Sequence, residues 1–251
     1  MGEGSFFRQV EGRPLFRLLR RHLLPGGEKR RGCSHYDAPM ARTRIKICGI
    51  RDEEALIAAA ESGADAVGFV FVEESPRYIQ PEEAWKLAGM LPPMIATVGL
   101  YQNPGVDDFA EVEQVCPTTL TQLHGNERDQ IVEMIGPDLI KAIKFDPATI
   151  AGRLKHYDAF AEVSAILIDG SAGGEGIAFE WDLLRPHLDG IATPIILAGG
   201  LTPENVGEAI KAVRPFAVDV SSGVERERGV KDPELIRAFC KAVVRADAEL
   251  L

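Results

Sequence analysis

The chain alternates short apolar runs with longer amphipathic stretches, and the alternation occurs eight times between residues 44 and 247. Each run is rich in β-branched residues and followed by a turn, as expected of parallel strands buried on both faces. Eight such units predict a single (β/α)8 TIM barrel, because an open doubly wound sheet usually has five or six strands. The predicted strands are residues 44–48, 66–71, 95–100, 119–123, 138–143, 164–168, 194–198 and 216–220.

Helix signals lie between these runs. Residues 52–63 carry acidic side chains in a first turn and end at Gly63, a typical C-terminal stop. Two further helices are predicted to begin with an N-cap residue followed by proline, at Thr202–Pro203 and Asp232–Pro233. Three aromatic side chains are predicted to pack in the protein and not to contact a ligand: Trp85, Phe179 and Trp181.

Charge divides the chain into two parts. Residues 1–39 carry a net charge of +4, whereas residues 40–251 carry −14. We predict a basic, mostly disordered N-terminal extension over 1–39 and a catalytic barrel domain over 40–251. The Arg-rich start also has features of a targeting peptide or of a basic patch for RNA or membrane. A simpler alternative is that translation of the functional body starts at Met40, so that the extension is an addition upstream of it.

Composition excludes several classes of function. The acidic body argues against nucleic acid as a partner, because phosphate backbones are bound by a surplus of Lys and Arg. No stretch approaches the roughly 20 apolar residues of a membrane-spanning helix. The cysteines are far apart, which predicts a reduced, cytoplasmic protein without a disulfide framework or a metal site. They are Cys33, Cys48, Cys116 and Cys240. We expect a monomer, which is the default for this barrel, with a small phosphorylated molecule as its substrate.

The barrel prediction also locates the site, because the loops that leave the carboxyl ends of the strands meet at one face. Polar and small residues stand at those ends. They are Cys48, Arg77, His124, Asp169, and the loop residues Gly199, Gly200, Ser222 and Gly223.

Cys48 and Asp169 form a candidate base and acid pair. The Cys48 thiol accepts a proton if its pKa falls towards neutrality, through nearby N–H dipoles or a bound substrate. Asp169 can donate a proton if its carboxyl is partly desolvated, and the glycine-rich segment 169–181 is a candidate lid. The alternatives are a small buried hydrophobe at Cys48 and a turn-capping carboxylate at Asp169.

The loops after the last two strands are a candidate phosphate site. Small residues at Gly199, Gly200, Ser222 and Gly223 let backbone N–H groups approach an anion. The alternative is that the glycines only permit tight turns.

Two cationic or titratable side chains complete the predicted rim. Arg77 can bind a carboxylate through two hydrogen bonds, or it can form a surface ion pair. His124 either lines the pocket or only ends its strand.

Together these residues identify a family: the chain resembles phosphoribosylanthranilate isomerase of tryptophan biosynthesis. The resemblance covers residues 44–247 and rests on motifs in the family's order: KICGI, ESGADAVGFVF, SPRYI, QLHG, the lid GG-x-G-x-x-F-E-W, GGLTPENV and RPFAVDVSSGVE. It implies an Amadori rearrangement of N-(5-phosphoribosyl)anthranilate without cofactor or metal. It also implies that Cys48 is the general base, that Asp169 is the general acid, and that Arg77 lies beside the anthranilate carboxylate. Glu175 departs from the family, which more often has Ser or Thr there.

Three rival functions stay open at this point. Ribulose-phosphate epimerase and indoleglycerol-phosphate synthase share the last two loops, but the first needs metal-binding histidines and the second a catalytic lysine at a strand end. Lys46 points the same way as Cys48 but one layer deeper, which weakens the synthase alternative. The third rival is an inactive barrel that senses a sugar phosphate.

Overall fold

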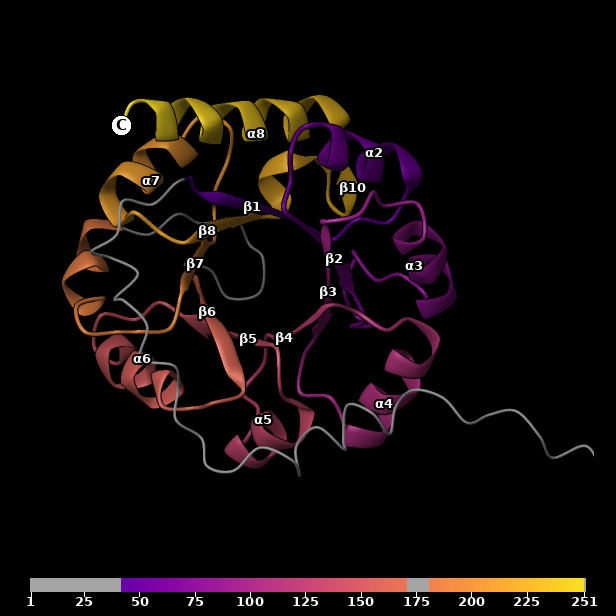
Figure 1. Cartoon of the computed structure of the whole chain (residues 1–251), viewed down its shortest axis with the longest axis horizontal. Helices are drawn as coiled ribbons and strands as arrows, with labels where there is room; N and C mark the ends of the chain where they lie inside the picture. Colours follow the sequence, from indigo (N-terminus) through magenta and orange to yellow (C-terminus); the bar gives the residue numbers. More distant parts are fainter. Residues whose placement is uncertain (1–41, 171–180, 251) are drawn as a thin grey trace, which may run out of the picture. The chain divides into compact units, whose positions relative to one another are not determined.

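Eight parallel strands form a closed barrel in the computed structural model, which describes residues 42–170 and 181–250 (Figure 1). Neighbouring strands follow the order of the chain, and β1 closes the barrel by pairing with both β2 and β8. The predicted (β/α)8 barrel is confirmed, and every predicted strand end agrees to within one residue. The strands are β1 Arg44–Cys48, β2 Ala66–Val70, β3 Ala96–Tyr101, β4 Leu120–Leu123, β5 Leu139–Lys144, β6 Val163–Asp169, β7 Ile195–Ala198 and β8 Ala217–Val220.

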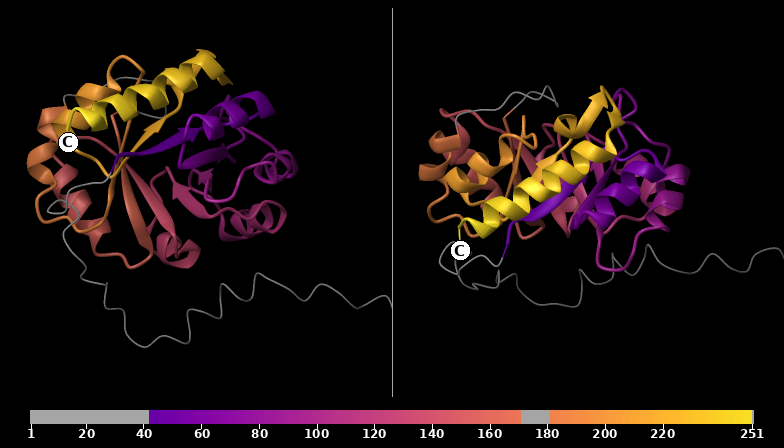
Figure 2. Two further views of the ribbon diagram at one scale, coloured as in Figure 1. Left: turned by 45° about the horizontal axis from the view of Figure 1, so that its top comes forward. Right: turned by 90° about the horizontal axis from the view of Figure 1, so that it is seen from above.

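Helices surround the barrel, and α8 runs along its outer wall (Figure 2). They are α2 Glu53–Glu61, α3 Pro81–Ala88, α4 Val106–Val115, α5 Asp129–Ile135, α6 Ile150–Asp158, α7 Val206–Val213 and α8 Pro233–Ala248. Between β6 and β7 the described residues form only two short 3-10 helices, η1 Trp181–Leu183 and η2 Arg185–His187. Pro186 in η2 has no N–H for a longer α-helix. After β8 come η3 Ser222–Val224 and a small hairpin, β9 Glu225–Glu227 with β10 Val230–Lys231.

Acidic side chains cap two of these helices, and the cap at Asp232 is the one that the sequence predicted. The Asp52 carboxylate accepts a hydrogen bond from the N–H of Ala55 at the start of α2. Asp232 accepts from the N–H groups of Glu234 and Leu235, and Pro233 is the first residue of α8. These caps satisfy N–H groups that have no partner within the helix.

Two local predictions are wrong. Helix α7 begins at Val206, with Asn205 as the preceding cap residue, and not at Thr202 and Pro203. The Asn205 side chain accepts from the N–H of Thr202 and donates to the carbonyl of Gly200, both at 2.8 Å, and so binds this segment as a loop. Trp85 is 53% exposed and not in the core, because α3 buries its alanine and leucine side chains instead.

Alternate residues of the strands point into the barrel, as the two-residue period of a strand requires. Small and aliphatic side chains fill the interior of the barrel below the cavity: Val98, Ile140, Ala142, Ala165, Leu167, Ile196, Ala198 and Ala217. The partly buried Trp181 packs against the larger core between strands and helices. Towards the carboxyl ends the inward positions are polar, and there the apolar filling gives way to a cavity.

Candidate active site

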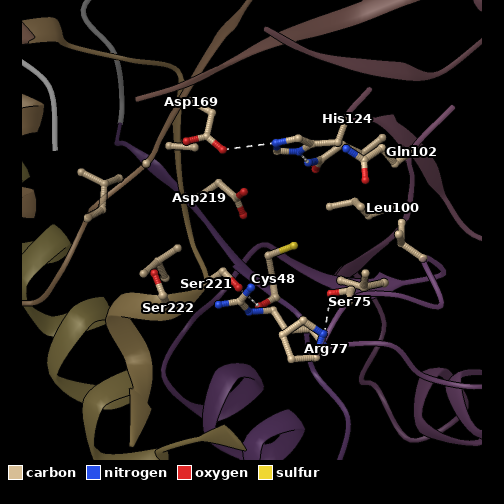
Figure 3. Close-up of a pocket in the computed structure, with 18 of the residues that line it drawn as sticks. Cys48, Ser75, Arg77, Leu100, Gln102, His124, Asp169, Asp219, Ser221 and Ser222 are labelled. Atoms are coloured by element: carbon tan, nitrogen blue, oxygen red, sulfur yellow. Dashed lines mark hydrogen bonds and ion pairs between the residues drawn. The ribbon is translucent and has the colours of Figure 1, made fainter. Parts of the chain in front are cut away.

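A cavity of about 260 Å³ opens at the carboxyl ends of the strands (Figure 3). Seven of the eight predicted site residues line the cavity. The exception is Gly223, which lies in the loop after β8. Cys48 and Asp169 enter from different walls (Figure 3). The lining residues that carry the chemistry are Cys48, Arg77, His124, Asp169, Gly199, Gly200, Asp219, Ser221 and Ser222.

Cys48 ends β1, and the residue is 4% exposed. The neighbouring Gly68 of β2 leaves room for it, because a Cβ there would lie 2.9 Å from the sulfur and 3.3 Å from the Lys46 ammonium. Lys46 points into the barrel one layer below the thiol and donates a hydrogen bond of 2.8 Å to the Asp219 carboxylate. The thiol is therefore held above a buried ion pair.

Burial raises the pKa of the Cys48 thiol, and Lys46 works in the opposite direction. The fall that the sequence suggested is thus absent from this structure. Burial also works to lower the pKa of Lys46, but Asp219 and the Cys48 thiol hold it above its ordinary value. Lys46 therefore stays protonated and supplies a positive charge below the sulfur.

Opposite Cys48, Asp169 and His124 form a pair. The Nε2 atom of His124 lies 3.2 Å from the Asp169 carboxylate, and its Nδ1 atom lies 2.9 Å from the side-chain amide nitrogen of Gln122. An amide nitrogen can only donate, so Nδ1 accepts and Nε2 carries the proton that is directed at Asp169. His124 thus lines the cavity and orients the carboxylate.

The loops after β7 and β8 pack tightly against each other. Gly199 and Gly200 have φ angles of +85° and +66°, which only glycine adopts readily. A Cβ at Gly199 would overlap the backbone of Gly170, and one at Gly223 would overlap the carbonyl of Leu201. Gly223 therefore lets the two loops meet, while its neighbours border the cavity.

Arg77 reaches the cavity from the loop after β2, and it is neither exposed nor in a surface ion pair. Its side chain is 10% exposed and donates two hydrogen bonds to the Glu225 carboxylate, from Nε at 2.7 Å and from Nη2 at 3.0 Å. Lys231 donates to the same carboxylate at 2.7 Å. One edge of the Arg77 guanidinium thus binds a carboxylate of the protein, Glu225, through two hydrogen bonds.

Sequence reasoning missed Asp219, Glu225 and Lys231. Asp219 stands inside the apolar strand β8, and a charged residue in a buried strand is a signal that the sequence did offer. Glu225 and Lys231 belong to the β9–β10 hairpin, whose pairing the sequence does not announce.

The described residues, 42–170 and 181–250, contain neither a cluster of metal-binding side chains nor a membrane-spanning helix. Within these ranges, no group of three or more His, Cys, Asp or Glu side chains is placed to hold a metal ion. The helices within them include none long and apolar enough to cross a membrane.

The fold and the cavity together are typical of (β/α)8-barrel enzymes that act on phosphorylated small molecules, because the loops after strands 7 and 8 commonly bind phosphate in this fold. The family model of "N-(5'phosphoribosyl)anthranilate (PRA) isomerase" matches residues 45–242. The chain belongs to this family.

Relatives with curated names agree with this assignment. An N-(5'-phosphoribosyl)anthranilate isomerase of Pseudomonas putida (strain GB-1) is 45% identical over 212 residues, covering 82% of this chain and 100% of the relative. The protein of the same name from Herminiimonas arsenicoxydans is 41% identical over 226 residues, covering 85% and 98%.

Solved structures give the same picture. A phosphoribosyl anthranilate isomerase in complex with reduced 1-(o-carboxyphenylamino)-1-deoxyribulose 5-phosphate has a TM-score of 0.71 and 40% identity, over 81% of this chain and 99% of its own. The enzyme from Thermotoga maritima has a TM-score of 0.72 and 41% identity, over the same shares of both chains.

Proposed function

We propose that this chain catalyses the Amadori rearrangement of N-(5-phosphoribosyl)anthranilate to 1-(2-carboxyphenylamino)-1-deoxyribulose 5-phosphate in tryptophan biosynthesis, with Cys48 as general base and Asp169 as general acid. The observation that carries the assignment is that the thiol and the carboxylate line one cavity from different walls (Figure 3). The reaction needs one group that gives a proton and another that takes one, on a sugar held by its phosphate.

The steps follow from these positions. In its protonated form, Asp169 gives a proton to the ring oxygen of the furanose as the bond from that oxygen to C1 breaks, which leaves an iminium at C1 and a carboxylate at Asp169. The Cys48 thiolate then removes the proton from C2, so that an enolamine forms and tautomerises to the ketone. Gly199 and Gly200 line the cavity without side chains, so that backbone N–H groups of their loop can approach the phosphate. Ser222 and Gly223 belong to the neighbouring loop, and Arg77 takes the ring carboxylate.

Lys46 supports this assignment of the base. Deprotonation of a buried thiol is unfavourable, and the ammonium below the sulfur offsets part of that cost. His124 supports the assignment of the acid, because it fixes the direction of the Asp169 carboxylate.

Turnover of phosphoribosylanthranilate, followed by its fluorescence, tests the function. Cys48→Ser and Asp169→Asn should each lower kcat by roughly 10²- to 10⁴-fold, because each removes a proton-transfer group. The affinity for reduced 1-(o-carboxyphenylamino)-1-deoxyribulose 5-phosphate should stay within a few-fold. Cys116→Ser is the matched control, since this buried thiol lies outside the cavity.

Unchanged turnover in Cys48→Ser and Asp169→Asn would refute these two roles. A wild-type protein that binds the ligand but does not turn over the substrate would favour the sensor alternative. The same assay on a form that lacks residues 1–39 tests whether the extension matters. The monomeric state and the cytoplasmic location stay predictions.

A further inference from the structure

We propose that Glu225 and Lys231 are positioning residues that turn Arg77 into a selective site for one carboxylate of the substrate. Glu225 fixes the guanidinium so that its unused edge serves the cavity, and Lys231 leaves the cluster with one surplus positive charge. This inference rests on the proposed function, since it concerns how that site recognises the anthranilate ring.

The hydrogen bonds of Arg77 leave part of its guanidinium available. Nε and one N–H of Nη2 are used by Glu225, at 2.7 and 3.0 Å. Nη1 makes no hydrogen bond to any residue in the described ranges, although Arg77 lines the cavity. A guanidinium has five N–H donors in a rigid plane, so fixing one edge also fixes the direction of the other.

Glu225 has no capacity left for a second role. Its Oε1 atom accepts from Arg77 and Lys231, and its Oε2 atom accepts from Arg77 and, at 3.1 Å, from the N–H of Gly229. A carboxylate has about four acceptor positions, and all are occupied. The Glu225 side chain is 4% exposed, so it holds the arginine and does not itself face a ligand.

The charges of the cluster do not cancel. Arg77 and Lys231 share the single carboxylate of Glu225; burial lowers the pKa of Lys231, and Glu225 works in the opposite direction to keep its ammonium charged. Lys231 is 3% exposed, and its remaining hydrogen bonds go to the neutral carbonyl and hydroxyl of Ser221. One buried positive charge therefore remains, and a substrate carboxylate at Arg77 neutralises it.

The backbone around the cluster is also closely fitted. A Cβ at Gly49 would lie 2.9 Å from Cδ of Arg77, so the stem of the arginine rests on the loop after β1. Gly229 has a φ of +85°, and a Cβ there would overlap the carbonyl of Pro76. The hairpin that carries Glu225 thus packs directly against the loop that carries Arg77, which restricts both partners.

A purely structural role for Glu225 is the competing explanation, and two ligands distinguish it. The first is reduced 1-(o-carboxyphenylamino)-1-deoxyribulose 5-phosphate, and the second is the same compound without the ring carboxyl. Calorimetry should show that the wild-type protein prefers the first by roughly 10- to 100-fold, because hydrogen bonds to charged groups have that value. Glu225→Gln should lose most of this preference, while its affinity for the carboxyl-free compound stays within about two-fold.

Controls make the result decisive. Glu227→Gln lies on the same hairpin with an exposed side chain and should keep the full preference. Glu225→Asp keeps the charge but shortens the reach, so it should lower the preference less than Glu225→Gln; it also serves if the glutamine variant does not fold. A Glu225→Gln protein that weakens both compounds equally, or keeps the preference, overturns the inference. Binding does not depend on turnover, so failure of the proposed function would appear separately, in the wild-type assay.

Discussion

Two lysines on the strands of this barrel each form a buried ion pair with a carboxylate, and the two pairs differ in their surroundings. Lys46 lies 2.8 Å from Asp219 inside the barrel, and Lys141 lies 2.7 Å from Glu127 on the helix side of β5. The side chains of the second pair are fully buried, at 0% exposure. The first pair touches the Cys48 thiol, whereas the ammonium of Lys141 lies 5.6 Å from the ring centre of Tyr157.

The neighbours change the chemistry of the two lysines. Burial works to lower the pKa of both, but Asp219 and Cys48 together raise that of Lys46 above its ordinary value. For Lys141, burial prevails over Glu127 and the pKa is lowered. A buried ion pair by itself is weak support for function, because such pairs also occur in purely structural positions. The adjacent thiol makes the Lys46 pair part of the site.

Of the substitutions considered, Lys46→Met should have the largest effect on catalysis. Loss of the ammonium leaves burial and Asp219, which raise the pKa of the thiol, opposed by the more weakly acting Lys231. A nearby opposite charge is worth about 1–3 pKa units, so kcat/KM at neutral pH should fall roughly 10- to 1,000-fold. In the variant, the limb of the pH profile of kcat/KM that reports deprotonation of the Cys48 thiol should move to higher pH.

A double variant, Lys46→Met with Asp219→Asn, controls for the orphaned carboxylate. Removal of that negative charge should recover part of the lost rate, because Asp219 also raises the thiol pKa. If Lys46→Met keeps both the wild-type rate per folded molecule and the wild-type pH profile, Lys46 does not act on the base.

Lys141→Met should instead change stability and leave catalysis intact. Breaking a buried pair leaves Glu127 charged and uncompensated, which costs about 3–5 kcal/mol of unfolding free energy. Urea titration measures this loss. Initial rates per folded molecule should match the wild type, and a large fall in kcat at full folding would contradict the structural role of this pair.

Alkylation of Cys48 by iodoacetamide tests directly whether Lys46, and not Lys141, affects the pKa of the thiol. Only the thiolate reacts, and burial raises the pKa of Cys48, so alkylation should be slow at pH 7 and accelerate as the pH rises. Lys46→Met should shift this rise upwards by about 1 unit or more, and Lys141→Met should leave it unchanged. Cys116 and Cys240, with pKa values of about 11 and about 12, serve as internal references in the peptide masses. A rise at the same pH in both variants would argue against the coupling of Lys46 to the thiol.

The sequence predicted the barrel well because its signal is repetitive. Eight apolar runs are each too short for a helix and carry turn residues at their ends, so errors at one run do not alter the count. The strand-end residues followed from the same pattern, since the carboxyl ends of parallel strands meet at one face. This is why Cys48, His124 and Asp169 could be assigned to one rim without coordinates, whereas the sequence left open whether His124 lines the cavity, as it does in the structure.

Pairings across long stretches of chain could not be predicted in this way. Arg77 and Glu225 are separated by 148 positions, and their contact depends on a hairpin and on the close approach of Gly229 to another loop. The pKa of Cys48 likewise depends on the balance of burial and Lys46, which a sequence does not contain. Residues 171–180 of the candidate lid at 169–181, which include Glu175, lie outside the described residues, as does the extension at 1–39.

Gly68→Ala should have a smaller and more local effect on the thiol. The added Cβ would meet the Cys48 sulfur at 2.9 Å and the Lys46 ammonium at 3.3 Å, so at least one of them must move. We expect a loss of about 1–3 kcal/mol in stability from overpacking, and a fall of roughly ten-fold in kcat/KM because small displacements of a reacting group are costly.

Gly152→Ala is the matched control: it lies exposed in α6, where an added Cβ meets nothing within 4 Å. That change should raise stability by about 0.5–1 kcal/mol and leave kcat/KM unaltered. Equal kinetics in the two alanine variants would show that the space beside the sulfur is not needed for proton transfer. The Lys46–Asp219 pair would then tolerate displacement, as expected of a structural pair such as Lys141–Glu127.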